Sequence, residues 1–236
     1  MLKKSLKIIG FIPAKENSSG LKNKNIKKLN NLTLVELAVL SSINSRIIDQ
    51  TYISSDSENI LNIGKKYNIN TIKRKKKYCN SSSSANDVIQ DFINTLKENY
   101  PKKNLVIVYL QPTSPFRSHK HIDLALEKYL KYKPNILLSV TKNKNFYKSF
   151  RIKKNKISNI FSSKNLTKNR QTFNEIYSPN GAIYIFTKNR FIKRNKLNFQ
   201  NAGFFLMSQI ESIDIDTKED YEFAKVLSKK YIQYKK

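Results

Sequence analysis

Asn104-Leu105-Val106-Ile107-Val108-Tyr109-Leu110-Gln111 is a short apolar run that leads into a loop holding two of the chain's six prolines. The run has the length and composition of a buried strand. After the loop, His119–Tyr132 carries apolar residues at helical spacing, which predicts a helix with one buried face. Together these segments predict a strand, a loop and a helix, the repeating unit of an α/β protein.

The same alternation of short apolar runs and longer segments of helical spacing continues along the chain. It predicts a doubly wound α/β fold with a mostly parallel sheet flanked by helices. The other predicted strands are Lys7–Pro13, Gln50–Ser55, Ile69–Arg74, Ile136–Thr141, Gly181–Thr187 and, at an edge, Phe204–Ser208. The other predicted helices are Leu34–Ile43, capped by Thr33, Ser57–Tyr67, capped by Asp56, then Ala85–Tyr100 and Thr217–Tyr231.

The segment from Lys142 to Tyr177, hereafter the arm, breaks this alternation. It is rich in lysine and asparagine, with scattered aromatic residues at Phe146, Tyr147, Phe150, Phe161 and Phe173. Two interpretations stay open: a long surface excursion, or a dimerisation arm that also reaches a substrate pocket. We expect a single domain over residues 1–236 with the arm, approximately residues 142–177, inserted into it.

The composition is strongly basic. Among 236 residues, 45 Lys and Arg face 17 Asp and Glu, a net charge of +28 that would ordinarily suggest a nucleic-acid or anionic-membrane partner. However, 38 Lys, 28 Asn and 28 Ile are residues of A/T-rich codons, and the lysines are spread throughout the chain, so a basic nucleic-acid-binding protein remains the less favoured alternative. No apolar run reaches the length of a membrane helix, and the single cysteine fits a reducing compartment. We therefore expect a cytoplasmic protein without membrane partners.

In an open parallel sheet, ligands bind at the carboxyl ends of the strands, which directs attention to the loops after the first, third and fourth strands. The first loop, residues 14–25, combines hydroxyl groups, Gly20 and three lysines, a set suited to a triphosphate. Read alone, in a chain this rich in lysine, the loop is more readily interpreted as an ordinary solvated loop, and it matches neither the dinucleotide-binding glycine pattern nor a P-loop. The two prolines predict that the loop after the fourth strand is a rigid turn that presents Gln111 to the crevice; the alternative is a stiff connection between strand and helix.

Two aspartates near the carboxyl terminus suggest a metal site. Asp214 and Asp216 alternate with Ile213 and Ile215, so in an extended segment both carboxylates share one face. Mg²⁺ is usually held by one or two carboxylates together with phosphate oxygens. The alternative is that Asp216 merely caps the last helix.

Five motifs follow one another in order along nearly the whole chain. They are Ile12-Pro13-Ala14-Lys15 continuing to Ser18-Ser19-Gly20 and Lys24-Asn25, then Ser54-Ser55-Asp56, Leu110-Gln111-Pro112-Thr113-Ser114-Pro115-Phe116-Arg117, Pro179-Asn180-Gly181-Ala182-Ile183-Tyr184, and Ser212-Ile213-Asp214-Ile215-Asp216-Thr217. In this order and spacing they resemble the acylneuraminate cytidylyltransferases, also called CMP-sialic acid synthetases.

The resemblance implies a Rossmann-like nucleotidyltransferase fold and a homodimer built through the arm. It implies Mg²⁺-dependent transfer of CMP from CTP to a nine-carbon 2-keto sugar acid, N-acetylneuraminate or a related nonulosonate such as legionaminate, with release of pyrophosphate. The residues implied for CTP are Lys15, Ser18, Ser19, Gly20, Lys24, Asn25, Arg74 and Ser82; those for the sugar are Gln111, Arg170, Asn180, Tyr184 and Phe199; those for the metal are Asp214 and Asp216. Lys24, Gln111 and Asp216 are the implied catalytic residues, and Arg74 is the implied reader of the cytosine.

The sequence also departs from the family pattern. Lys15 stands where the family has an arginine, which keeps the charge but loses the two-pronged donor pattern that matches a phosphate. Ser19, Ser81 and Ser178 stand where a lysine, an acidic residue and an arginine are usual. Two further alternatives therefore stay open: a nucleotidyltransferase for another sugar acid or a sugar phosphate, and a catalytically weakened paralogue.

Overall fold

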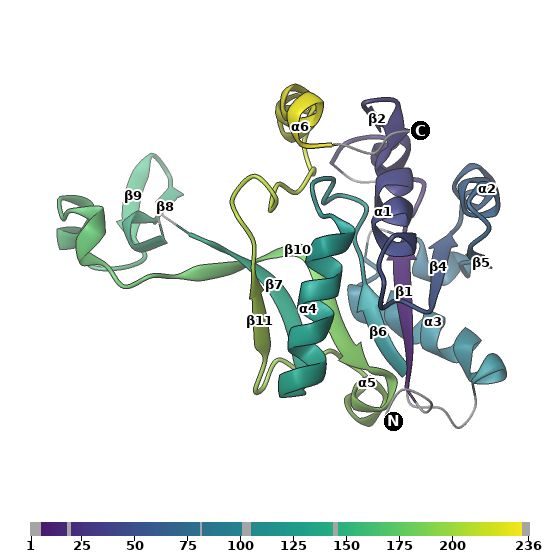
Figure 1. Cartoon of the computed structure of the whole chain (residues 1–236). Helices are drawn as coiled ribbons and strands as arrows, with labels where there is room; N and C mark the ends of the chain where they lie inside the picture. The colour runs from purple at the N-terminus through teal and green to yellow at the C-terminus, as the bar shows by residue number, and fades with distance from the viewer. Residues whose placement is uncertain (1–5, 18–19, 81, 101–104, 144–145, 233–236) are drawn as a thin grey trace.

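A seven-stranded sheet forms the centre of the molecule, in the order β11-β7-β10-β6-β1-β4-β5 (Figure 1). The computed structural model describes residues 6–17, 20–80, 82–100, 105–143 and 146–232. The strands of the sheet are β1 (Lys7–Pro13), β4 (Gln50–Ser55), β5 (Asn70–Lys73), β6 (Leu105–Tyr109), β7 (Ile136–Lys142), β10 (Tyr177–Thr187) and β11 (Gly203–Leu206). Neighbouring strands pair in parallel except around β10, which is antiparallel to β6 and to β7. The predicted mostly parallel sheet is confirmed.

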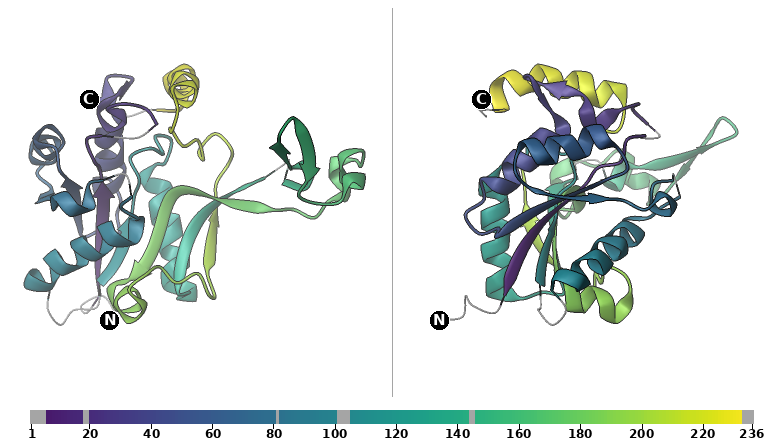
Figure 2. Two further views of the ribbon diagram at one scale, coloured as in Figure 1. Left: turned by 180° about the vertical axis from the view of Figure 1, so that it is seen from behind. Right: turned by 90° about the vertical axis from the view of Figure 1, so that its right-hand side faces the viewer.

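Helices cover both faces of the sheet (Figure 2). The helices are α1 (Leu34–Ile43), α2 (Glu58–Lys66), α3 (Ala85–Asn99), α4 (His119–Tyr132), α5 (Lys188–Arg194) and α6 (Lys218–Tyr231). Strand β1 shows the division, because Ile8 and Ile12 pack in the cluster with α1, α2 and α4, whereas Ile9 and Phe11 pack with α3 and α5. This alternation buries a strand on both faces and confirms the doubly wound arrangement. None of the helices in the described ranges is long and apolar enough to cross a membrane.

A third apolar cluster fixes the segment that carries the two aspartates. The short hairpin of β2 (Lys28–Leu29) and β3 (Leu32–Thr33) packs with α6, and Ile215 is fully buried between them. The backbone N–H of Ile215 also donates to the carbonyl of Thr113 at 2.9 Å. The segment before α6 is therefore held against the loop that follows β6, which brings parts of the chain about a hundred residues apart to one edge of the sheet.

The helix starts test the predicted caps. The Thr33 hydroxyl accepts from the backbone N–H of Glu36, whose carboxylate accepts in return from Thr33, so the predicted cap of α1 is confirmed. The predicted cap at Asp56 is wrong. The N-cap of α2 is Ser57, and Asp56 Oδ1 accepts from the backbone N–H of Glu16 at 2.9 Å, because that carboxylate is engaged in holding the first loop.

The arm projects away from the sheet on the long ends of β7 and β10 (Figure 1). It carries a small hairpin of β8 (Phe150–Lys153) and β9 (Lys156–Asn159), in which every residue is exposed. Its aromatic residues gather next to this hairpin, with ring centroids 4.9 Å apart for both Phe146 with Phe161 and Tyr147 with Phe173. The arm is therefore a folded unit with its own aromatic cluster.

Candidate active site

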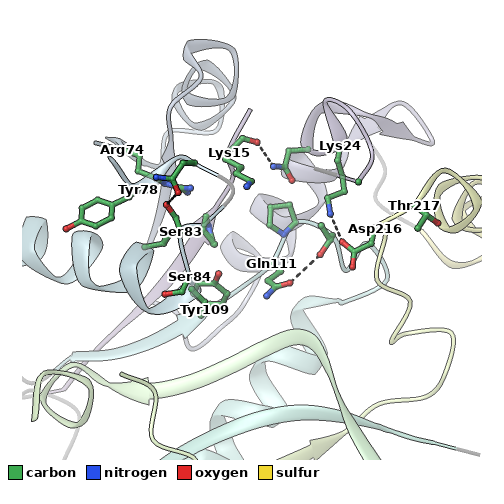
Figure 3. A pocket seen from close by; sticks show the side chains of 18 residues that line it. Lys15, Lys24, Arg74, Tyr78, Ser83, Ser84, Tyr109, Gln111, Asp216 and Thr217 are labelled. Atoms are coloured by element: carbon green, nitrogen blue, oxygen red, sulfur yellow. Dashed lines mark hydrogen bonds and ion pairs between the residues drawn. The ribbon is translucent and has the colours of Figure 1, made fainter. Parts of the chain in front are cut away.

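A cavity of about 500 Å³ opens at the carboxyl edge of the sheet, between the loops that follow β1, β5 and β6. These are the first, third and fourth strands predicted from the sequence, as the rule for parallel sheets requires. Figure 3 shows two ends of this cavity. Lys24, Asp216 and Thr217 lie at one end, Arg74, Tyr78, Ser83, Ser84 and Tyr109 lie at the other, and Lys15 and Gln111 lie between them.

An ion pair dominates the first end, hereafter the ionic end. Lys24 Nζ lies 2.7 Å from Asp216 Oδ1, and the lysine side chain is only 12% exposed whereas that of the aspartate is 69% exposed. Burial raises the pKa of the neighbouring Asp214; the Asp216 carboxylate adds to this, while the Thr113 hydroxyl and the Lys24 ammonium oppose it. The Lys24 ammonium group therefore pairs with the exposed Asp216, and its charge also acts on the half-buried Asp214.

The two aspartates fit a hard divalent cation. Asp214 Oδ1 is buried and has no hydrogen-bond partner among the described residues, which is costly for an oxygen of this kind. A cation bound by this oxygen and by Asp216 would satisfy it. The described residues contain no cluster of three or more His, Cys, Asp or Glu suited to a metal, so water and phosphate oxygens would complete the coordination shell.

Gly20 and Asn25 hold the first loop in place. A Cβ atom on Gly20 would lie 2.4 Å from the carbonyl oxygen of Asp216, so only glycine allows the loop to approach the segment of the two aspartates this closely. Asn25 is buried, and its Nδ2 donates to the carbonyl of Lys15 at 2.7 Å, which closes the loop on itself. Lys15 lines the cavity. The implied phosphate residues Ser18 and Ser19 lie outside the described residues.

A buried arginine dominates the other end, hereafter the guanidinium end. Arg74 Nε donates to Ser54 Oγ at 3.2 Å and its Nη2 donates to the Ser54 carbonyl at 2.7 Å. Burial lowers the pKa of Arg74, and among the described residues no carboxylate oxygen lies within 4.0 Å of its guanidinium. A desolvated cation on a cavity wall with unused N–H groups is suited to a ligand that offers acceptors.

Hydroxyl, amide and phenol groups surround this arginine. Asn80, Ser83, Ser84 and Tyr109 line the cavity, and burial raises the pKa of Tyr109 to about 12, so its phenol stays neutral. Ser82, which the resemblance implies here, is exposed, and its hydroxyl donates to Asn80 instead. Tyr109 is a lining residue that the sequence reasoning missed. Its spacing of two from Gln111 was the available signal, because such residues share one face of an extended segment.

Gln111 is positioned by a buried arginine and a glycine. Arg117 donates to the carbonyl of Gln111 at 2.7 Å and to that of Ala182 at 3.0 Å, which ties the proline-rich turn to β10. Gly181 has φ of +76°, and a Cβ there would lie 3.2 Å from Gln111 Oε1 and 3.6 Å from Asp214 Oδ2. The irregularity of β10 at this turn thus brings its backbone against both side chains.

The remaining residues implied for the sugar lie outside the lining of the cavity. Asn180 is buried and supports the turn, accepting from Ser139 and donating to Ser212 at 2.8 Å. Tyr184 is half-buried with its ring edge-on to that of Tyr109, at a centroid distance of 6.0 Å. Phe199 is exposed. Arg170 lies in a short 3-10 helix of the arm, and its side chain is outside the described residues.

Comparison with known proteins agrees with this geometry. The chain is 26% identical to the post-translational flagellin modification protein B of Campylobacter coli, over 94% of this chain and 95% of the relative. It is 26% identical to the CMP-N,N'-diacetyllegionaminic acid synthase of Campylobacter jejuni, over 93% and 94%. It is 27% identical to the N-acylneuraminate cytidylyltransferase of Streptococcus agalactiae, over 92% of this chain but 52% of the relative, so the chain spans about half the length of that protein.

A solved structure and a family model establish the fold and the family of the chain. A solved structure of a CMP:2-keto-3-deoxy-manno-octonic acid synthetase complexed with CTP superposes with a TM-score of 0.69 at 12% identity, covering 94% of this chain and 98% of that chain, which shows a common fold. The family model described as cytidylyltransferase matches residues 9–236, nearly the whole chain. The resemblance drawn from the motifs is confirmed: the chain belongs to the cytidylyltransferase family and is a nucleotidyltransferase.

Proposed function

We propose that this cytidylyltransferase transfers CMP from CTP to a nine-carbon 2-keto sugar acid, N-acetylneuraminate or a related nonulosonate such as legionaminate, and releases pyrophosphate. The observation that carries the proposal is the division of one cavity into a guanidinium end, where Arg74 lies among uncharged hydroxyl, amide and phenol groups, and an ionic end around Lys24 and Asp216. A nucleoside triphosphate has the same division between base and phosphates. Relatives that span the chain are named for CMP transfer to sugar acids of this class, which supports the choice of acceptor.

Arg74 supports cytosine as the base. A guanidinium only donates hydrogen bonds, and Nε and Nη2 of Arg74 are each held by Ser54. The remaining N–H groups match O2 and N3 of cytosine, which are both acceptors. Uracil carries a hydrogen on N3, so the same arginine would face a donor, and the mismatch leaves a buried N–H without a partner.

Charge neutralisation supports the chemistry at the other end. Lys24 and Lys15 line the cavity where the phosphates would lie, and an ammonium group there stabilises the charge that develops on departing pyrophosphate. Asp214 and Asp216 would hold Mg²⁺, which supplies Lewis-acid stabilisation of the phosphate oxygens when bound. Gln111, between the two ends, can orient the anomeric hydroxyl of the sugar acid for in-line attack on the α-phosphorus.

Pyrophosphate release provides the direct test. The protein is incubated with CTP, Mg²⁺ and one sugar acid at a time: N-acetylneuraminate, legionaminate, pseudaminate or the eight-carbon 3-deoxy-octulosonate. We expect turnover with at least one nine-carbon acid and kcat/KM at least about tenfold lower with the eight-carbon acid. Turnover with the eight-carbon acid alone would mean that the acceptor is that sugar acid and not a nine-carbon one. No turnover with any acid would contradict the proposal.

We also propose that the protein is a homodimer that associates through the arm. The β8-β9 hairpin exposes Phe150, Ile152 and Ile157, and an isolated two-stranded hairpin is only marginally stable in water. The arm projects away from the sheet of its own chain (Figure 1), and Arg170 belongs to the arm, which supports a role for this residue at the cavity of a second copy. Arginine can form a two-pronged pair with a sugar carboxylate.

We predict that one charged substitution in the arm disrupts the dimer. Ile152→Glu should convert the dimer to a monomer, because it buries an unpaired carboxylate in the proposed interface. Light scattering coupled to size-exclusion chromatography measures the mass. Val226→Glu in α6 is the matched control, since Val226 is 73% exposed and Ile152 is 75% exposed. The proposal fails if wild type is a monomer at micromolar concentration or if both variants keep the dimer.

A further inference from the structure

The motif Ser54-Ser55-Asp56 at the end of β4 acts on the cavity only through other residues. None of its three residues is among those that line the cavity. Ser54 is nevertheless buried, and it accepts two hydrogen bonds from the Arg74 guanidinium, one at Oγ and one at its carbonyl. The backbone N–H of Arg74 donates to the carbonyl of Ser55 at 2.8 Å. The end of β4 thus holds both the main chain and the side chain of this arginine.

We propose that Ser54 is the positioning residue that sets the discrimination between cytosine and uracil, by fixing the plane of the Arg74 guanidinium. This inference rests on the proposed function, because it assumes that Arg74 meets the base of CTP.

The surroundings of Arg74 leave Ser54 as its principal anchor. A guanidinium in an ion pair takes its orientation from the carboxylate, but among the described residues no carboxylate oxygen lies within 4.0 Å of Arg74. The neutral groups that line this end, such as Ser84 and Tyr109, have no hydrogen bond to Arg74 among those of the described residues. Two bonds to one residue define the plane of a rigid, planar group.

A fixed guanidinium plane allows Arg74 to distinguish cytosine from uracil. With Nε and Nη2 held, the free N–H groups of Arg74 point in a set direction, and cytosine accepts from them. Uracil would place its own N3–H against them, and a guanidinium that cannot tilt cannot relieve that conflict. If the Nε bond is removed, the group can tilt and admit uracil at lower cost. The ratio of CTP use to UTP use should therefore fall more than the use of CTP itself.

The experiment compares two neighbouring serines. Ser54→Ala removes the oxygen that holds Nε and leaves the carbonyl in place. Ser55→Ala is the matched control, because Ser55 is equally buried and its Oγ accepts from the backbone N–H of Ser57, at the start of α2, not from Arg74. Ser54→Thr keeps the oxygen and should restore the wild-type behaviour. Steady-state kinetics with CTP and with UTP gives the two values of kcat/KM, titration calorimetry gives the affinities for CMP and UMP, and thermal melting reports on the fold.

We expect Ser54→Ala to lower the CTP to UTP ratio of kcat/KM by about tenfold, with kcat for CTP within about threefold of wild type. Ser55→Ala should change the ratio by less than about twofold even where it lowers the melting temperature. The inference is overturned if the ratio is unchanged in Ser54→Ala, if Ser55→Ala lowers it equally, or if wild type does not discriminate between the two nucleotides. A wild type that turns over neither nucleotide and binds neither monophosphate would instead contradict the proposed function.

Discussion

Asp214→Asn is expected to lower kcat/KM for CTP by about 100-fold while leaving the melting temperature of the nucleotide-free protein at least as high as that of wild type. Activity falls because the amide no longer carries the negative charge that attracts a divalent cation. Stability does not fall, because burial raises the pKa of Asp214, which means that folding disfavours its ionised form. Function and stability should therefore change in different directions.

The raised pKa of Asp214 also sets the sign of the pH dependence of stability. An acid whose pKa is raised by folding binds its proton more tightly in the folded chain, so wild type should gain stability relative to Asp214→Asn as the pH falls from neutral. Melting curves over a pH series measure this difference. Kinetics over a Mg²⁺ titration should show that the variant needs more Mg²⁺ for half-maximal activity.

Glu219→Gln provides the matched control for this charge change. Glu219 is an exposed acid in the first turn of α6, five residues beyond Asp214, and it does not line the cavity. Glu219→Gln should leave kcat/KM within about twofold of wild type, since surface substitutions of this kind have small effects. If Asp214→Asn lowers the activity and the melting temperature together, the carboxylate supports the fold and not the metal.

The regular part of the fold could be predicted from the sequence because its signals are local. Residues 7–13, 50–55, 34–43 and 119–132 were predicted with the bounds that the structure has, since their apolar spacing and flanking caps lie within a few residues. Strand β10 was predicted to start at Gly181 but starts at Tyr177. Its first part holds Pro179 and Asn180, which are poor strand formers, and it pairs with β7 across an irregularity in the register.

The elements that were missed are short or polar. Helix α5 and the β8-β9 hairpin are short and rich in lysine, arginine and asparagine, so neither has a buried face long enough to show a period. The wrong cap at Asp56 has a different cause. Its carboxylate is engaged by the backbone of Glu16, forty residues away, and no local pattern reports a contact of that range.

The site residues also divide into those that a sequence pattern identifies and those whose role depends on long-range contacts. Lys24, Gln111 and Asp216 came from the quoted motifs and Arg74 from the family resemblance, and the structure brings all four to one cavity. The function of Asn25, in contrast, depends on where its amide points. It donates to the carbonyl of Lys15 and so shapes the phosphate loop from inside, a role that only the hydrogen-bond pattern distinguishes from direct contact with a ligand.

Lys24→Met is expected to lower kcat/KM for CTP by about 100-fold or more, because it removes a cation from the end of the cavity where we place pyrophosphate. The lysine is 12% exposed and lines the cavity, so its charge acts in a partly desolvated place where it is weakly screened. Lys22→Met is the matched control, since Lys22 belongs to the same loop but is exposed and away from the cavity lining. It should change kcat/KM by less than about twofold. Equal losses in both variants would show that the loop acts through its overall charge.

The partner of Lys24 makes a sharper test. Without nucleotide, Lys24 Nζ bonds Asp216 Oδ1 at 2.7 Å, so each single variant leaves one charge unpaired beside the other acid, Asp214. The double variant Lys24→Met with Asp216→Asn removes both charges at once. Because the two side chains are in direct contact, their effects on kcat/KM should not add, and the double variant should lose less activity than the product of the two single losses. Additive losses would mean that the pair seen here is broken before the step that limits turnover.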